Sequence, residues 1–266
     1  MKKVAYTLVL VLAGLGMFGM NAAAEDAAEI MKKSHLAYYY AGDDGVADVS
    51  MKIVSKRGKE RVKEFIMLRL DEEEGGAQKY YTYFKKPSDV SRLTFMVHKS
   101  PEGNDMRWIY VPSVDLVKPI SADDKNSSFV GSNFSYEDVS GRHWSEDTHT
   151  MAGDSTIDGK AVYVIESVPV EAYGGFARKV SYICQETHLP LVENYYNKKG
   201  NLERVFRAEN IEEVNGIMTM TSRSMENVKK GGKTVIEFSN IEYNVGMKSD
   251  LFTERYLKNP PRKYVR

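Results

Sequence analysis

The sequence contains one cysteine, Cys184, among 266 residues. A single cysteine cannot form an internal disulfide, so a packed core must stabilise the fold even in an oxidising compartment. Cys184 lies in the predicted strand Arg178–Gln185, on the same alternating face as Tyr182. We therefore interpret it as a small buried hydrophobic side chain rather than as a reactive thiol.

An excess of charge of either sign is also absent. Lys and Arg together number 37, and Asp and Glu together number 37. Without residues 1–24 the balance becomes 35 basic against 37 acidic residues, because that segment holds two lysines and no acidic residue. A protein that binds nucleic acid electrostatically carries a strongly basic surface. The composition therefore predicts no nucleic-acid partner.

Motifs that carry catalysis or bind metals are lacking as well. The five histidines follow neither a His-Glu-x-x-His nor a His-x-His spacing. Residues 25–266 have no Gly-x-Ser-x-Gly elbow, phosphate-binding loop or Gly-x-Gly-x-x-Gly turn. Its acidic runs, Asp71–Glu74 and Asp123–Asp124, are typical of solvated turns. We therefore predict no enzymatic activity, metal site or cofactor; a hydrolase would need a catalytic constellation that only folding brings together.

The N-terminal segment has the pattern of a secretory signal peptide. Lys2 and Lys3 precede an apolar run over Val4–Met20, and Ala22–Ala24 supplies the small residues of a cleavage site. No cysteine near this site could carry a lipid anchor. We therefore predict that residues 1–24 form a signal peptide cleaved after Ala24, and that residues 25–266 form a single exported, periplasmic domain.

The hydrophobic pattern predicts one N-terminal helix and then almost only strands. Apolar residues repeat at helical spacing over Glu25–Tyr40, and the period then changes to two. Twelve segments alternate in this way: Val49–Lys56, Val62–Asp71, Gln78–Lys85, Arg92–Lys99, Asp105–Val111, Thr148–Ile157, Ala161–Val170, Arg178–Gln185, Leu189–Asn197, Leu202–Ile211, Ile217–Asn227 and Thr234–Asn244.

Successive strands without long crossover helices favour a mainly β fold with one antiparallel sheet. A sheet of this size curls, so we expect an incomplete (half) barrel whose concave apolar face needs a cover. The predicted covers are the N-terminal helix, the central segment Ser113–Val139 and a short C-terminal helix at Ser249–Leu257.

Aromatic and methionine side chains are frequent on these strands. One curled sheet with few helices has little else to fill its concavity, and methionines suit a pocket that adapts to flexible acyl chains. We therefore predict a hydrophobic ligand-binding cavity with a lid. The candidate residues are Phe65, Met67, Phe95, Val97, Trp108, Tyr110, Phe129, Val130, Phe134 and Tyr136.

Four stretches of the chain resemble the LolA-like outer-membrane lipoprotein-sorting family. The sequence is similar to the branch of periplasmic proteins that accompany resistance-nodulation-division (RND) type exporters. The stretches are Trp108–Pro112, the central motif Ser127–Val139, the strand–turn–strand region Thr187–Gly200 and the ending Leu251–Leu257. The lid-locking arginine of the smaller LolA chaperones is not carried over to Arg69 or Arg92.

The resemblance implies a half-barrel closed by helices, with an apolar cavity for acyl chains of a lipid or lipoprotein. It implies a periplasmic carrier, or chaperone, that moves this cargo toward the outer membrane. An inner-membrane RND-type exporter and an outer-membrane acceptor would be its partners. The alternative is an adaptor that docks on an exporter or envelope complex, with a tightly packed core in place of a cavity that lipid can fill.

The central motif is the candidate lid. We expect Phe129, Val130, Phe134 and Tyr136 to turn inward and cap one mouth of the half-barrel, while Gly131 allows the backbone to bend. The charged residues of this region, Asp124, Lys125, Glu137 and Asp138, would face water.

Introducing a charged side chain at position 134 tests whether the central motif forms a lid over the cavity. Phe134→Asp should weaken the binding of acyl lipids, because a carboxylate in the cavity wall opposes the entry of a hydrocarbon chain. Titration with a fluorescent fatty acid measures the change. Unchanged binding by a folded variant would contradict a cavity-lining role for this loop.

Overall fold

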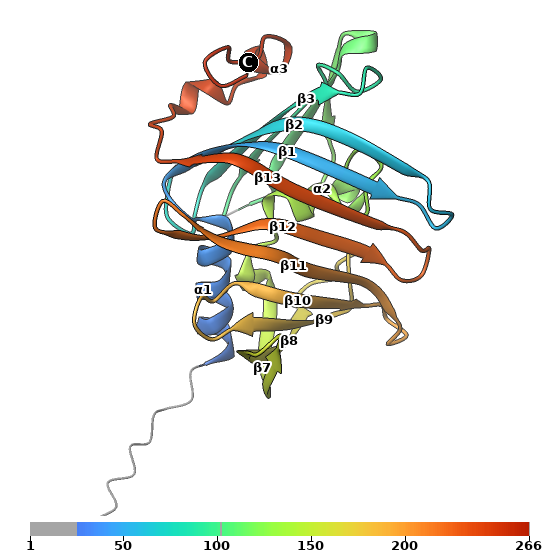
Figure 1. Ribbon diagram of the computed structural model, residues 1–266, viewed down its shortest axis with the longest axis vertical. Helices are drawn as coiled ribbons and strands as arrows, with labels where there is room; N and C mark the ends of the chain where they lie inside the picture. The colour runs from blue at the N-terminus through green and yellow to red at the C-terminus, as the bar shows by residue number, and fades with distance from the viewer. Residues whose placement is uncertain (1–25, 102, 266) are drawn as a thin grey trace, which may run out of the picture.

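The computed structural model describes residues 26–101 and 103–265 (Figure 1). The predicted signal peptide and its cleavage site lie outside these residues. The described chain forms one antiparallel sheet of thirteen strands that is not closed into a barrel, in the order β6-β5-β4-β3-β2-β1-β13-β12-β11-β10-β9-β8-β7. The predicted fold class, a curled open antiparallel sheet with few helices, is confirmed.

The sheet contains one strand more than the sequence pattern predicted. This strand is β6, in the segment that was expected to be a cover. The strands are β1 (Asp44–Val54), β2 (Glu60–Asp71), β3 (Gln78–Lys86), β4 (Thr94–Lys99), β5 (Met106–Val111), β6 (Leu116–Ile120), β7 (Asp147–Ile157), β8 (Lys160–Pro169), β9 (Arg178–Cys184), β10 (Pro190–Tyr196), β11 (Leu202–Val214), β12 (Ile217–Asn227) and β13 (Lys233–Tyr243).

The strand order places the central segment across the open side of the sheet. Strands β6 and β7 are the two edges, so the chain between Ile120 and Asp147 must pass from one edge to the other. This segment contains the helix α2 (Tyr136–Ser140) and short 3-10 turns at Asp123–Asn126, Phe129–Gly131 and Trp144–Glu146. In Figure 1, α2 lies behind β13 and β12. The segment therefore covers the concave face, as predicted.

The N-terminal helix α1 (Ala27–Tyr39) is the second cover. The carboxylate of Asp26 caps it by accepting a hydrogen bond from the Ala28 N–H. Its apolar face packs Ile30 and Met31 against Ile165 and Ile183 of β8 and β9. Figure 1 shows the helix running roughly perpendicular to the strands.

The C-terminal segment covers the other face of the sheet, which corrects the expectation that it shares the concave side. A 3-10 turn at Ser249–Leu251 and the helix α3 (Glu254–Lys258) bury Phe252 and Leu257 against Leu68, Tyr81 and Met96. The Tyr81 hydroxyl donates to the Tyr256 carbonyl at 2.8 Å. Strands β2 to β4 carry large apolar side chains on both faces, so the second face also requires a cover.

Truncation of Phe252 tests this packing. Its side chain is fully buried, so Phe252→Ala should lower the free energy of unfolding by about 3–5 kcal/mol. Leu116→Ala is the control, because Leu116 is exposed and should change stability by less than about 0.5 kcal/mol. Chemical denaturation measures both. Equal effects of the two substitutions would mean that the C-terminal segment does not pack on the sheet.

Candidate ligand-binding cavity

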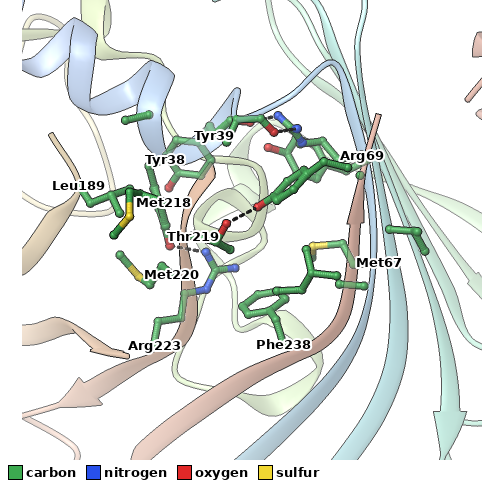
Figure 2. A pocket seen from close by; sticks show the side chains of 18 of the residues that line it. Tyr38, Tyr39, Met67, Arg69, Leu189, Met218, Thr219, Met220, Arg223 and Phe238 are labelled. Atoms are coloured by element: carbon green, nitrogen blue, oxygen red, sulfur yellow. Dashed lines mark hydrogen bonds between the residues drawn. The ribbon is translucent and has the colours of Figure 1, made fainter. Parts of the chain in front are cut away.

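An open cavity lies between the C-terminal half of α1 and the concave face of β1, β2, β12 and β13 (Figure 2). Its volume is about 120 Å³, and its mouth opens to solvent. Most of its lining is apolar: Ala37, Ala47, Met67, Val139, Leu189, Met218, Met220, Phe238 and Ile241. The cavity can therefore accept a hydrocarbon group.

Methionines form much of the adaptable wall. Met218 and Met220 come from β12, and Met67 faces them from β2. A methionine side chain has three rotatable bonds and a polarisable sulfur, so it can repack around guests of different shape. This composition suits a flexible chain better than a rigid ring system.

Arg69 joins β2 to the end of α1 beside the cavity. Its Nη1 donates to the Tyr39 carbonyl at 2.6 Å and to the Asp71 carboxylate at 2.9 Å. Its Nη2 donates to the Gly42 carbonyl at 2.8 Å and also to the Ala41 carbonyl. The last carbonyls of a helix have no partner within the helix, so this guanidinium both satisfies that end and attaches it to the sheet.

Arg223 of β12 is a second buried arginine in the cavity wall, and its surroundings differ. Its Nη1 donates to the Tyr38 hydroxyl, while Nε is buried without a hydrogen-bond partner. The guanidinium lies 4.9 Å from the ring centre of Phe238 and 5.9 Å from that of Phe134. Burial raises the pKa of Tyr38, so its hydroxyl is neutral. Among residues 26–101 and 103–265, Arg223 forms no ion pair with a carboxylate.

Two carboxylates of the central segment are paired with cations. Glu137 accepts from Lys125 at 2.8 Å, and Asp138 accepts from Arg204 at 2.6 Å. Glu137 is buried, and Asp138 is half-buried. The expectation that both carboxylates face water is therefore wrong. Each one satisfies a cation inside the fold, where an unpaired charge would be costly.

The central motif is attached to the sheet by hydrogen bonds. The Lys63 ammonium donates to the Val130 carbonyl at 2.7 Å, and the Asn133 side-chain amide donates to the Gly232 carbonyl at 2.8 Å. Gly131 has a φ of +79°, a conformation that glycine adopts readily. The Asn133 bond therefore holds the motif against the turn between β12 and β13.

The structure separates the predicted cavity residues into three groups. Met67 lines the cavity itself. The remaining members on the concave side are buried in, or packed against, the adjoining core: Phe65, Phe95, Val97, Phe129, Val130, Phe134 and Tyr136. Trp108 and Tyr110 lie on the opposite face, under the C-terminal segment. Trp108 pairs with Met96 of β4, and Tyr110 pairs with Thr94 of the same strand. Residues 94 and 96 are two apart and therefore share one face of β4.

The sequence reasoning missed both arginines as contributors to the site. For Arg223 one signal was present, since it stands two residues before Met225 on a strand and must share its face. Met225 is buried in the concave core, so an arginine on the same face is unexpected there. The role of Arg69 depends on the end of α1 reaching it, which no local pattern reveals.

Comparisons with known proteins agree with this architecture. A family model with the description "Uncharacterized protein" matches residues 76–259. A solved domain from Vibrio parahaemolyticus, assigned to outer membrane lipoprotein sorting, is 26% identical with a TM-score of 0.81, covering 87% of this chain and 98% of that one. The chain belongs to the LolA-like outer-membrane lipoprotein-sorting family.

Two further structures extend the likeness within this LolA-like fold. A DUF1329 family protein from Desulfovibrio piger is 26% identical with a TM-score of 0.81, covering 87% of this chain and 97% of that one. A LolA superfamily protein from Nitrosomonas europaea is 18% identical with a TM-score of 0.68, covering 88% of this chain and all of that one, and so shares the fold. No curated protein matches the chain.

Two features are absent from the described part of this LolA-like chain. None of its described helices is long and apolar enough to cross a membrane. No cluster of three or more His, Cys, Asp or Glu side chains within residues 26–101 and 103–265 could hold a metal ion.

Removal of the Arg69 guanidinium tests how α1 is held. Arg69→Met should lower the free energy of unfolding by about 3–5 kcal/mol, because the Asp71 carboxylate loses its cation and the Ala41 and Gly42 carbonyls lose their side-chain donor. Asp71 and the Tyr39 carbonyl would keep only the Gln78 amide. Arg61→Met is the matched control, since Arg61 is exposed on the same strand. Urea denaturation measures both variants. A loss in Arg69→Met no greater than in Arg61→Met would contradict the attachment.

Proposed function

We propose that this protein is a periplasmic carrier that shields the acyl chains of a lipid or lipoprotein in the cavity beneath α1. The observation that carries the proposal is the cavity itself, about 120 Å³ with a mostly apolar, methionine-rich wall and a mouth open to solvent. Burial of hydrocarbon is worth about 0.8 kcal/mol per methylene, so even a short acyl segment gains substantial free energy by entering. As a member of the LolA-like family, the protein is not an enzyme.

The neighbours support the direction of transport. The Vibrio parahaemolyticus domain is assigned to outer membrane lipoprotein sorting, and it matches this chain over nearly its full length. The proposed carrier therefore takes acyl cargo across the periplasm toward the outer membrane. Loading by an inner-membrane RND-type exporter and unloading to an outer-membrane acceptor rest on the sequence resemblance.

The cavity favours a carrier over an adaptor. An adaptor needs only its outer surface, and its interior should be packed to the density of an ordinary core. Here the space between α1 and the sheet is unfilled, while the neighbouring core around Phe65, Phe84 and Phe129 is closely packed.

The direct test is to identify what the protein carries. The chain is purified from its own periplasm without detergent, then studied by native mass spectrometry and lipid extraction. A lipid or acylated peptide in near-stoichiometric amount is the expected result. A bare protein that also takes up no fluorescent fatty acid would favour the adaptor.

Filling the cavity should abolish uptake. Ala37 is a half-buried residue of α1 in the cavity lining, so Ala37→Trp places an indole in the space that the chain would occupy. We expect the affinity for a fluorescent fatty acid to fall at least about tenfold, because the guest loses the apolar contact that drives binding.

Ala28→Trp is the matched control for this experiment. Ala28 is half-buried on the same helix but lies outside the cavity lining. It should retain the affinity of the wild type, and circular dichroism should show both variants folded. Equal uptake by Ala37→Trp and the wild type would show that acyl chains do not occupy this cavity.

A further inference from the structure

Arg223 is the feature of the cavity that shielding hydrocarbon does not explain. An arginine side chain stays charged in proteins and carries five N–H donors. In Figure 2 its guanidinium stands among the lining side chains, with Met220 on one side and Phe238 on the other. Only one of its hydrogen bonds is made within the described chain, to the Tyr38 hydroxyl, although just 8% of the residue is exposed.

The comparison with nearby cations shows how unusual this is. Arg69 is saturated by carbonyls and Asp71, and Arg204 is paired with Asp138 at 2.6 Å. Arg107 is more deeply buried than Arg223 and its Nε also lacks a partner, but it has the Asp105 carboxylate at 2.7 Å. Arg223 has a neutral hydroxyl and a buried Nε without a partner. A buried cation is normally paired, so this one lacks the anion that the fold supplies to the others.

Aromatic rings supply part of the missing stabilisation. The guanidinium lies 4.9 Å from the ring centre of Phe238, 5.4 Å from that of Tyr38 and 5.9 Å from that of Phe134. Such rings attract a cation electrostatically. The donors on its edge remain directed in the guanidinium plane, where the fork geometry matches the two oxygens of a carboxylate or phosphate.

We infer that the cavity takes an acyl chain with an oxyanion at one end, and that Arg223 binds this oxyanion. This inference rests on the proposed carrier function and names its cargo class. The hydrocarbon lies along the methionine-lined wall from Met67 to Met218, and the acid group reaches the cation beside it. The cargo is therefore an anionic amphiphile, with a fatty-acid carboxylate and a lipid phosphate as the two sources of the same chemistry.

The test compares ligands of one chain length that differ only at the head. Displacement of the neutral dye N-phenyl-1-naphthylamine at pH 8 is measured for dodecanoic acid, dodecyl phosphate and dodecanol, each below its aggregation concentration. Wild-type protein should bind at least one anion about tenfold or more tighter than the alcohol, the effect of one charged hydrogen-bonded pair. The better anion identifies the source as carboxylate or phosphate.

Arg223→Met removes the donors and keeps an apolar side chain of similar length. Its preference for an anion, taken as the ratio of its own affinities for each anion and for dodecanol, should fall to within about threefold of unity. Arg207→Met is the matched control, because Arg207 is exposed on the neighbouring strand β11 and should leave the preference unchanged.

The outcomes distinguish a failure of anion binding by Arg223 from a failure of the carrier function. Equal affinity of the wild type for the alcohol and both anions would overturn the inference while leaving acyl binding intact, and this result does not depend on any variant folding. An anion preference that persists in Arg223→Met would also overturn it. If the wild type binds neither the dye nor any dodecyl compound, the carrier function itself fails, and the inference fails with it.

Discussion

The concave face of the sheet is the constraint on which the rest of the structure depends. Thirteen strands curl round it, but β6 and β7 remain unpaired edges, so no strand closes the apolar interior from water. The chain covers that interior with α1 and with the segment that runs from one edge to the other. Because these covers are few, they cannot fill the concavity in the way that a second sheet would. The unfilled remainder is the cavity.

Both faces of the sheet carry apolar side chains that must be shielded from water, and different segments of the chain cover them. On strands β2 to β4 the outer face is closed by Phe252 and Leu257, which pack as a conventional core. On the inner face near β12 and β13, α1 approaches with its tyrosine-rich end and leaves space. The same sheet therefore has a densely packed side that provides stability and an open side that is available for binding.

Much of this architecture could be predicted from the sequence, because alternation is a local signal. The helix ending at Tyr39 and most strands follow directly from periods of 3.6 and two residues. Alternation also separates the two faces of a single strand, as it does for Phe95 and Met96. It does not say which faces of neighbouring strands coincide: Trp108 was predicted beside Phe95, but it pairs with Met96 on the opposite face. What it cannot supply is which cover each face receives. The C-terminal segment was therefore assigned to the wrong side of the sheet.

The site was harder to predict than the fold for the same reason. The aromatic residues selected from the sequence mostly became core beside the cavity, since a packed ring and a ligand-lining ring look alike in a strand. The two arginines in the cavity wall depend on contacts with distant parts of the chain. Arg69 meets the end of α1 some thirty residues earlier, and Arg223 meets Tyr38 across 185 positions.

The two arginines show how one side-chain type can serve stability or binding according to its partners. Arg69 has its acceptors supplied by the fold, so it attaches α1 and has little capacity left for a guest. Arg223 has aromatic rings close to its guanidinium and a single neutral acceptor. A buried cation in that state is least stable when the cavity is empty. Its charge therefore favours occupancy by an anion, and the uncharged lining beside it favours an anion that carries a hydrocarbon chain.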